Sequence, residues 1–411
     1  MKKYFERDYA RIPDAPLMTV EVKDPASGLE GYVCIHSMGR FGGASGGLRC
    51  VPDVSRKEIE LLAKAMTYKY SFWNIEQGGA KAGIVVPYDC AAERKGELVQ
   101  RMATHLEPLI RSGIWSPWGD MFFYAQDLVT FYAGIDIDYT PAEIDSSRRT
   151  AVSAFASLRA TIEHLGLPPS RARIAIEGFG NVAMCLAEHI KECGAKIVAV
   201  SNHEGCVVNE SGLDIDLLIQ HRHADAVGWI HGAGPWQTAP RERLFDVTCD
   251  VLVPGARVHT IDETTAARLN AKALVPIANV PCTDAALAVL DRRGIPYVPD
   301  YVVNGGGVCG HILGVNMSRE EVKAFSDKFV QMVARMLKMS EARGIPARVL
   351  ADQIAHQNYG AIAKGAYDHD GRFTHLIHEL QKRYLLPGDP VKKFLKRRIR
   401  RTFALLESAF R

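Results

Sequence analysis

The segment from Arg173 to Val200 constrains the fold more than any other part of the chain. Arg173 and an apolar run at 174–176 lead into Glu177-Gly178-Phe179-Gly180-Asn181-Val182-Ala183, and a second apolar run follows at 197–200. This pattern predicts a strand, a tight glycine turn of the form G-x-G-x-x-A, a helix and a second strand. Such a βαβ unit is typical of a Rossmann-type domain with a parallel sheet.

The glycine turn indicates a site for the phosphates of a dinucleotide. Its first glycine permits the tight turn, its second permits close approach of a pyrophosphate, and the helix N-terminus supplies N–H donors. We therefore expect NAD or NADP to contact Gly178, Gly180, Asn181 and Val182. A βαβ unit that binds no nucleotide is the alternative.

The residues after the second strand leave the choice between NAD and NADP open. An acidic residue often binds the ribose hydroxyls of NAD at this place. This chain instead has Ser201, Asn202 and His203. Asn202 can bind a ribose without repelling a 2′-phosphate, and His203 can attract one.

Further apolar runs predict more strands of the same sheet at 251–254 and 273–279, and a strand within 297–308 that leads into a glycine loop. Ligands of open α/β sheets bind beyond the carboxyl ends of the strands. Ala278, Asn279 and Asn304 fall at such ends. Turn residues that satisfy their own backbone are the alternative for both asparagines.

The first part of the chain reads as alternating strands and helices. Strands are predicted at 19–23 and 32–36, followed by a glycine-rich loop at 39–47. The polar segment 139–149 is interpreted as a hinge, and a long amphipathic helix is predicted from Ser318 to Arg343. The length of 411 residues alone predicts two or three domains, and the alternating strands and helices on both sides of the hinge predict an α/β protein with a second domain after it.

Two lysines of the first domain lie in unusual surroundings. Lys69 lies near the end of a helix predicted to begin at Ser55, on an apolar and aromatic segment, and Lys81 follows Gly78-Gly79. Burial in such places would lower the pKa of a lysine toward the range used in catalysis. Two solvated surface lysines are the alternative.

Composition argues against several classes of function. The net charge of +3 gives no indication of binding to nucleic acid or to a membrane. The basic segment 392–401 leaves a role with nucleic acid or a membrane open, and a solvated helix face is the favoured interpretation. Nine cysteines without a C-x-x-C pair favour reduced thiols in the cytoplasm over disulfides or a metal site.

Several segments in order resemble the glutamate/leucine/phenylalanine/valine dehydrogenase family, over about residues 30 to 340. They are Gly46-Gly47-Leu48-Arg49, Met66-Thr67-Tyr68-Lys69, Gly78-Gly79-Ala80-Lys81, Ala125-Gln126-Asp127-Leu128-Val129-Thr130, Thr150-Ala151, Gly178-Phe179-Gly180-Asn181-Val182-Ala183 and Pro299-Asp300-Tyr301-Val302-Val303-Asn304-Gly305-Gly306-Gly307-Val308. The resemblance implies reversible oxidative deamination of an L-amino acid to a 2-oxo acid and ammonia, with NAD or NADP as cofactor.

The resemblance also implies a domain order and a homo-oligomer. A substrate-binding and oligomerisation domain would span 1–148, a Rossmann-type domain 149–320, and C-terminal helices at 321–411 would return to the first domain. The oligomer would form through the first domain.

The family pattern assigns roles to individual residues. Lys69 would hold the substrate α-carboxylate, with Gly46 and Gly47 beside it. Lys81 would activate water, and Asp127 would carry protons to and from the amine, although a helix-capping or ion-paired aspartate is the alternative reading. The remaining assignments are Asn304 at the amino group and Thr150, Ala278 and Asn279 at the nicotinamide end.

Two departures bear on the substrate. Glutamate dehydrogenases have a lysine for the side-chain carboxylate where this chain has Ser45, and a serine where it has His311. An unpaired carboxylate in a closed pocket is costly. The sequence therefore favours an apolar or aromatic amino acid over glutamate, with His311 either at its polar end or bonded to backbone.

Two other functions remain open at this point. One is a catalytically silent relative that acts as a binding or assembly protein, which the presence of Lys81 and Asp127 disfavours. The other is a nicotinamide oxidoreductase for another 2-oxo acid or an imine, which the pairing of Lys69 with Lys81 disfavours.

Overall fold

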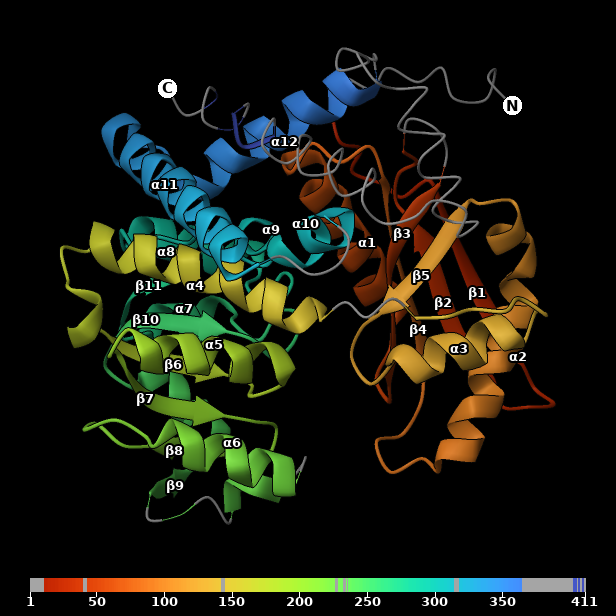
Figure 1. The fold of residues 1–411 in the computed structure, drawn as a ribbon, viewed down its shortest axis with the longest axis horizontal. Helices are drawn as coiled ribbons and strands as arrows, with labels where there is room; N and C mark the ends of the chain where they lie inside the picture. The colour runs from red at the N-terminus through yellow and green to blue at the C-terminus, as the bar shows by residue number, and fades with distance from the viewer. Residues whose placement is uncertain are drawn as a thin grey trace. The chain divides into compact units, whose positions relative to one another are not determined.

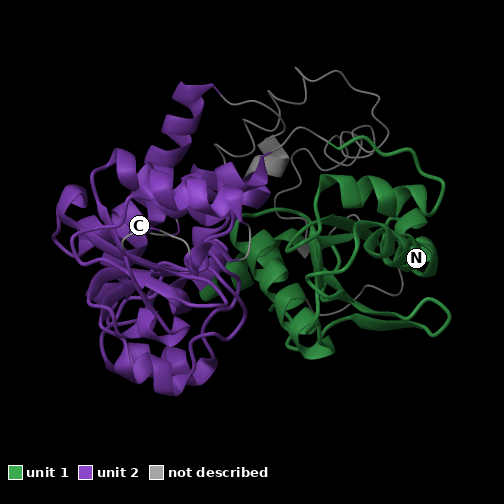
Figure 2. Cartoon of the chain, turned by 90° about the horizontal axis from the view of Figure 1, so that it is seen from below, with its two compact units in different colours: residues 1–143, 352–391 green, residues 144–351, 392–411 purple. Residues whose placement is uncertain are grey.

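The computed structural model describes residues 11–39, 43–141, 145–225, 228–231, 234, 236–313, 318–363, 402–404, 406 and 409. The chain divides into two compact units, one of residues 1–143 and 352–391 and one of residues 144–351 and 392–411 (Figure 2). Each unit has its own sheet and its own helices (Figure 1). The predicted α/β protein of two domains is confirmed.

The first unit contains a mixed sheet. Its strands are β1 (Met18–Asp24), β2 (Leu29–Ile35), β3 (Ala44–Val51), β4 (Gly78–Val85) and β5 (Trp115–Gly119). They lie in the order β1-β2-β4-β3-β5, with β3 parallel to both β4 and β5 and the other pairs antiparallel. The strands predicted at 19–23 and 32–36 are confirmed as this hairpin.

Helices cover both faces of this sheet. They are α1 (Arg56–Phe72), α2 (Ala92–Arg111) and α3 (Ala125–Ala133). Ile59 of α1 lies in one buried cluster with Cys34 of β2. Met102 of α2 and Phe131 of α3 lie in another cluster with Val33. Because successive strand residues point to opposite faces, β2 is buried on both sides.

Helix α1 follows the sequence prediction closely at its start. The Ser55 side chain accepts a hydrogen bond from the backbone N–H of Glu58, as an N-cap should. The helix continues to Phe72, because the apolar face extends through the buried Tyr70 and Phe72. Lys69 therefore lies in the last turn, as predicted.

The prediction of a glycine loop through Gly46 and Gly47 is wrong, because both lie inside strand β3. They serve packing within the sheet. A Cβ on Gly46 would lie 1.6 Å from the carbonyl oxygen of Ala80 in β4. Gly79 of β4 has a similar role, since a Cβ there would lie 2.3 Å from the backbone nitrogen of Thr67 in α1. Strands and helix therefore approach more closely than side chains would allow.

The second unit contains a sheet of Rossmann type. Its strands are β6 (Arg173–Glu177), β7 (Lys196–Ser201), β8 (Cys206–Val208), β9 (Gln237–Ala239), β10 (Cys249–Pro254) and β11 (Ala271–Leu274). The order is β11-β10-β6-β7-β8-β9, parallel from β11 to β7 and antiparallel beyond. The predicted βαβ unit is confirmed as β6, helix α5 (Asn181–Glu192) and β7.

Most of the remaining helices belong to this second unit. They are α4 (Ser146–His164), α6 (Ile215–Ala224), α7 (Glu263–Arg268), α8 (Asp284–Arg292), α9 (Asp300–Val303), α10 (Gly306–Leu313), α11 (Arg319–Arg343) and the 3-10 helices η2 (Pro169–Arg171), η3 (Gly228–His231) and η4 (Arg241–Asp246). The predicted helix from Ser318 to Arg343 is confirmed as α11, which packs on α4. Helix α12 (Ala347–Ala363) contains the boundary between the units. The basic segment 392–401 lies outside the described residues.

The predicted strand within 297–308 is wrong. Tyr297 forms only an isolated bridge to Leu274, and helices α9 and α10 follow. Pro299 caps α9, and its carbonyl oxygen accepts hydrogen bonds from Val302 and Val303. Proline is well suited to the start of a helix because its φ is fixed near the helical value.

A buried acid, Glu177, ends strand β6 just before the glycine turn. Its side chain is 3% exposed, and its Oε2 accepts a hydrogen bond of 2.9 Å from Thr260 Oγ1. Burial raises the pKa of Glu177 to about 7, although the hydrogen bond from Thr260 opposes the shift. Glu177 therefore changes charge near neutral pH.

Within the described residues, no helix is both long and apolar enough to cross a bilayer.

Gly79→Ala should destabilise the first unit. The added methyl group would meet the backbone of Thr67 at 2.3 Å, so the free energy of unfolding should fall by about 3 kcal/mol or more. Gly96→Ala in α2 is the control, because its methyl group would lie 3.8 Å from Thr130 Cγ2 and should stabilise the helix by about 0.5–1 kcal/mol. Urea unfolding measures both. Equal effects would contradict the close packing of β4 on α1.

Glu177→Gln should make stability less dependent on pH. Because the pKa of Glu177 is raised by folding, the side chain does not lower the free energy of unfolding below about pH 4.5. Between this pH and about pH 7 it lowers the free energy of unfolding increasingly. The amide introduced by this substitution can still accept from Thr260 but does not ionise. The variant should gain up to about 3 kcal/mol over wild type between these pH values. Urea unfolding at pH 4.5 and 8 measures this gain, and a constant difference would contradict the burial of a titrating acid.

Candidate functional site

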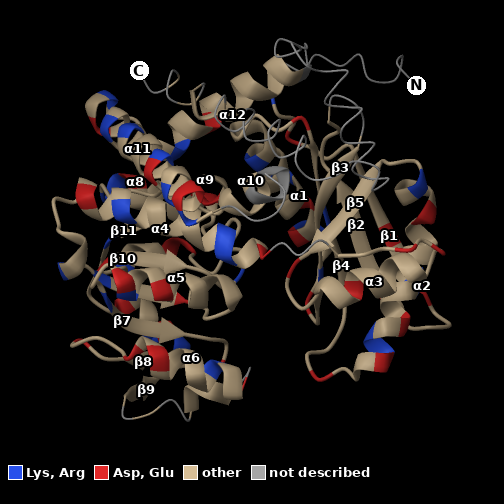
Figure 3. Cartoon of the chain, viewed as in Figure 1, with Lys and Arg blue, Asp and Glu red and all other residues tan. Residues whose placement is uncertain are grey.

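Lys81 is the centre of a buried group of charges in the first unit. Its side chain is 4% exposed, and its Nζ lies 2.7 Å from Oδ2 of Asp120, which follows β5. Most charged residues in Figure 3 lie on helices and loops rather than on the strands. Lys81 is buried within β4, whereas Lys23 of β1 in the same sheet is exposed.

Arg49 of β3 extends this group. Its Nε donates to the same Oδ2 of Asp120 at 2.9 Å, and its Nη1 lies 2.7 Å from Glu58 Oε1. The side chains of Arg49 and Glu58 are 4% and 11% exposed. Two buried cations thus face two carboxylates. This balance is what makes burial of the charges tolerable.

The environment shifts the pKa of both members of the central pair. Burial lowers the pKa of Lys81, and neighbouring Arg49 adds to this, while Asp120 opposes it. Burial alone would raise the pKa of Asp120, but Arg49 and Lys81 together hold it well below the usual range. Asp120 therefore stays ionised, and Lys81 is a lysine whose proton is easier to remove than usual.

Asp127 lies at the third position of α3 and makes different contacts. Its Oδ2 accepts from the backbone N–H of Tyr124 at 2.7 Å and from Lys95 Nζ at 2.8 Å. These are the capping and ion-pair interactions that the sequence left open as an alternative. The carboxylate in contact with Lys81 is Asp120, and the role of Asp127 in proton transfer stays a prediction.

Ser45 of β3 and Tyr70 of α1 form a buried polar pair in the same unit. Ser45 Oγ lies 2.6 Å from Tyr70 Oη, and both residues are buried. Burial raises the pKa of Tyr70 to about 12, although the hydrogen bond with Ser45 opposes the shift. The pair is therefore uncharged at neutral pH. Lys69, next to Tyr70, is also buried, at 6% exposed.

The glycine turn of the second unit fits the phosphates of a dinucleotide. Gly178 has φ of 76°, and a Cβ there would lie 3.0 Å from the carbonyl oxygen of Gly255. Gly180 is the N-cap of α5 and has open space where its Cβ would be. Since no side chain caps α5, the N–H groups of its first turn, at Asn181 and Val182, can bind an anion.

The end of β7 holds a loop that is stabilised by Asn202. Its Oδ1 accepts from the backbone N–H groups of Glu204 and Gly205, at 2.8 and 3.0 Å. Ser201 Oγ is buried without a hydrogen-bond partner among the described residues. A ribose would therefore meet a loop whose shape is fixed by Asn202, and the structure leaves the choice between NAD and NADP open.

Asn304 is the C-cap of α9. Its Nδ2 donates to Asn279 Oδ1 at 3.0 Å and to the Ile277 carbonyl at 3.2 Å. Its Oδ1 is buried without a partner among the described residues, so it can accept from a nicotinamide amide or from a substrate ammonium group. Ala278 lies between these two partners in the sequence.

Helix α4 and the glycines at the start of α10 complete this region. Thr150 Oγ1 donates to Ser146, and a Cβ on Gly307 would lie 2.7 Å from it. Ser153 Oγ donates to the Val303 carbonyl and accepts from Gly306. His311 lies in α10, but its side chain is outside the described residues.

The predicted residues therefore fall into two groups, each within one unit. The first unit holds Ser45, Gly46, Gly47, Lys69, Lys81 and Asp127, and the second holds the predicted cofactor residues with Asn304. The sequence missed Asp120 and Tyr70. Neither lies in a recognisable motif, and only the pairing of β3 with β5 and the extension of α1 reveal them.

Comparison with known proteins agrees with this arrangement. The family described as Glutamate/Leucine/Phenylalanine/Valine dehydrogenase matches residues 144–363, and its dimerisation domain matches residues 16–135. Glutamate dehydrogenase of Thermotoga maritima is 31% identical over 74% of this chain and 78% of its own length. NAD-specific glutamate dehydrogenase of Staphylococcus aureus is 29% identical over 78% and 82%.

A solved structure gives the same result. The hetero-hexameric glutamate dehydrogenase of Thermus thermophilus, in its Leu-bound form, has a TM-score of 0.74 and 26% identity, over 85% of this chain and 89% of its own. The family resemblance expected from the sequence is thus confirmed. The chain belongs to the glutamate/leucine/phenylalanine/valine dehydrogenase family and is an amino-acid dehydrogenase, of a family that uses NAD or NADP.

Proposed function

We propose that this protein catalyses the reversible oxidative deamination of an apolar or aromatic L-amino acid, rather than glutamate, to the 2-oxo acid and ammonia. The observation that supports this substrate is the Ser45–Tyr70 pair. At the position where glutamate dehydrogenases have a lysine, Ser45 Oγ is buried and 2.6 Å from Tyr70 Oη. A side-chain carboxylate there would gain no cation from Ser45, and an unpaired buried carboxylate is costly.

The chemistry proposed for the first unit uses its buried cations. Lys69 binds the substrate α-carboxylate, and Lys81, whose pKa is lowered by burial, is the base in its neutral form. Once the α-carbon has lost its hydride, Lys81 takes a proton from the water that attacks this carbon, and the resulting ammonium charge helps to stabilise the carbinolamine oxygen. Asp127 takes a proton from the substrate ammonium group before the hydride leaves, and it returns a proton to the nitrogen as this departs as ammonia.

The second unit holds the cofactor in this proposal. The first turn of α5 binds the phosphates, and Thr150, Ala278 and Asn279 position the nicotinamide end with Asn304. When bound, the cofactor accepts a hydride from the substrate α-carbon. The similar proteins of Thermotoga maritima and Staphylococcus aureus have names that specify glutamate, so glutamate is the competing substrate in every test.

We further propose that copies of this chain assemble into a homo-oligomer through the first unit. The match of residues 16–135 to a dimerisation domain supports assembly through this part of the chain.

Ser45→Lys should shift the enzyme toward glutamate. A new lysine would pair with the γ-carboxylate, and a hydrogen bond to a charged group contributes about 1.5–3 kcal/mol. The ratio of kcat/KM for glutamate to that for leucine or phenylalanine should therefore rise about 10-fold to 100-fold. Ser45→Met is the matched control, because it has similar length and no charge. The proposal fails if wild type already has its highest kcat/KM with glutamate.

Lys81→Ala and Asp127→Asn should each abolish most turnover while leaving cofactor binding intact. Loss of a general acid or base typically costs about 10²–10⁴ in rate. Steady-state kinetics and titration of NADH and NADPH fluorescence measure the two properties. Lys95→Met is the control for Asp127→Asn, since it removes the ion pair of 2.8 Å and keeps the carboxylate. Near-normal turnover of Asp127→Asn, or equal losses in it and Lys95→Met, would contradict the role of Asp127.

A further inference from the structure

We propose that Asp120 is a positioning residue for the reaction, which holds the amine of Lys81 in place and opposes the loss of its proton. The proposal rests on the proposed function, because it takes Lys81 to be the base. It is supported by direct contact, since Asp120 Oδ2 lies 2.7 Å from Lys81 Nζ. Asp127, which the sequence predicts to carry protons to and from the amine, forms hydrogen bonds with Lys95 and with the backbone N–H of Tyr124 instead.

The sheet itself creates the space for this carboxylate. Gly47 of β3 is paired with Trp118 of β5, two residues before Asp120. A Cβ on Gly47 would lie 2.7 Å from the Asp120 Cβ and 2.9 Å from the Gly119 carbonyl oxygen. Any side chain at position 47 would therefore displace Asp120 from its contact with Lys81.

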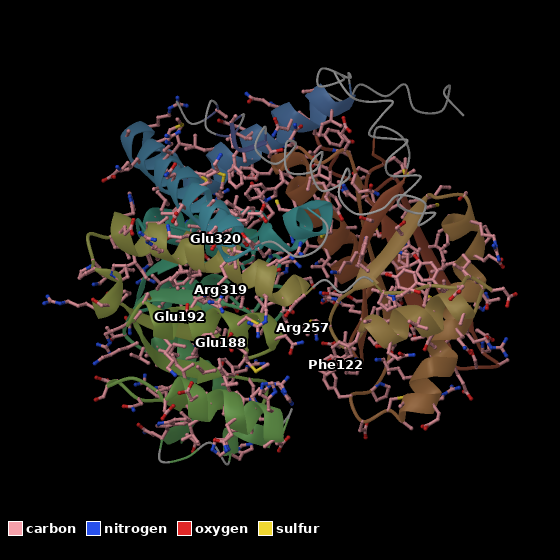
Figure 4. All side chains as sticks on the ribbon, viewed as in Figure 1. Phe122, Glu188, Glu192, Arg257, Arg319 and Glu320 are labelled. Atoms are coloured by element: carbon pink, nitrogen blue, oxygen red, sulfur yellow. The ribbon has the colours of Figure 1, made fainter. Side chains whose placement is uncertain are left out.

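A tight turn fixes the backbone of Asp120. Its N–H and carbonyl oxygen exchange hydrogen bonds with those of Phe123, at 3.2 and 3.1 Å. Within this turn Phe122 has φ of 54°, a conformation that is unfavourable for a residue other than glycine. Strain of this kind often accompanies a functional site. Phe122, labelled in Figure 4, is exposed and contacts the Tyr88 ring at 4.8 Å between centroids.

The same oxygen of Asp120 is shared by two cations. Arg49 Nε lies 2.9 Å from it, and Arg49 also pairs with Glu58 at 2.7 Å. The charged groups facing Lys81 are therefore Asp120 from the segment after β5, Arg49 from β3 and Glu58 from α1. Asp120 favours the protonated lysine, whereas Arg49 and burial favour the neutral amine.

These opposing effects assign Asp120 a specific function. Without it, Lys81 would be buried beside Arg49 with Glu58 as the remaining facing carboxylate, and it would lose its proton at a lower pH. With it, the amine keeps its proton up to a higher pH and is held on a fixed oxygen. The pH at which Lys81 becomes a base is then set by residue 120.

The test measures the titration of Lys81 itself. Competitive labelling with acetic anhydride across pH, read at Lys81 by mass spectrometry, gives its midpoint without any need for turnover. Asp120→Asn should move this midpoint to lower pH by about one unit or more, which is a tenfold change in proton affinity. Arg49→Gln should move it to higher pH, because the repelling cation is removed and Asp120 remains.

The two variants separate the proposal from simple damage to the fold. Shifts of opposite sign support it, and an unchanged midpoint in Asp120→Asn, or shifts of the same sign in both, would overturn it. If Asp120→Asn does not fold, the upward shift in Arg49→Gln still decides, since a downward or absent shift refutes the shared carboxylate. In the active enzyme, the acidic limb of the kcat/KM profile for deamination should follow the labelling midpoint. If the two variants shift the labelling midpoint in opposite directions but the wild-type protein has no turnover, the role of Asp120 stands and only the proposed function is refuted.

Discussion

The ion pair between Lys81 Nζ and Asp120 Oδ2, at 2.7 Å, is the interaction on which the first unit depends. An unpaired charge buried at this depth would cost several kcal/mol, so the lysine needs a carboxylate in direct contact. The pairing of β3 with β4 and β5 provides it, and Gly46 and Gly47 leave room for the neighbouring chain atoms. Packing and chemistry are thus coupled, because the glycines that bring the strands together also allow Lys81 to contact Asp120.

The cofactor site proposed for the second unit relies on different physical means. This proposed site consists of backbone N–H groups at α5 and of amide side chains; Gly178 permits the tight turn, and Gly180 leaves open space at the N-cap. Such a site recognises an anion through dipoles and hydrogen bonds, and it needs no buried cation. The buried acid Glu177 lies directly before this turn, which gives the unit a charge that changes near neutral pH.

Much of this arrangement follows from the sequence, because it depends on local patterns. The βαβ unit, the Ser55 cap and the helix from Ser318 all rest on short-range spacing, and each is found as predicted. The loop predicted at glycines 46 and 47 is wrong, because the reason for these glycines lies in Ala80 and Asp120, which are distant in sequence. The carboxylate partner of Lys81 escapes prediction for the same reason, since strand pairing alone brings residue 120 to it. The Ser45–Tyr70 contact likewise depends on how far α1 extends.

The most direct test of the proposed chemistry is reductive amination by the wild-type protein. Oxidation of NADH and of NADPH is followed by absorbance with 2-oxo acids, with and without ammonia. Oxidation that requires ammonia and is fastest with an apolar or aromatic 2-oxo acid is the predicted result. Oxidation without ammonia, or a higher kcat/KM with 2-oxoglutarate than with every apolar or aromatic 2-oxo acid, would contradict it.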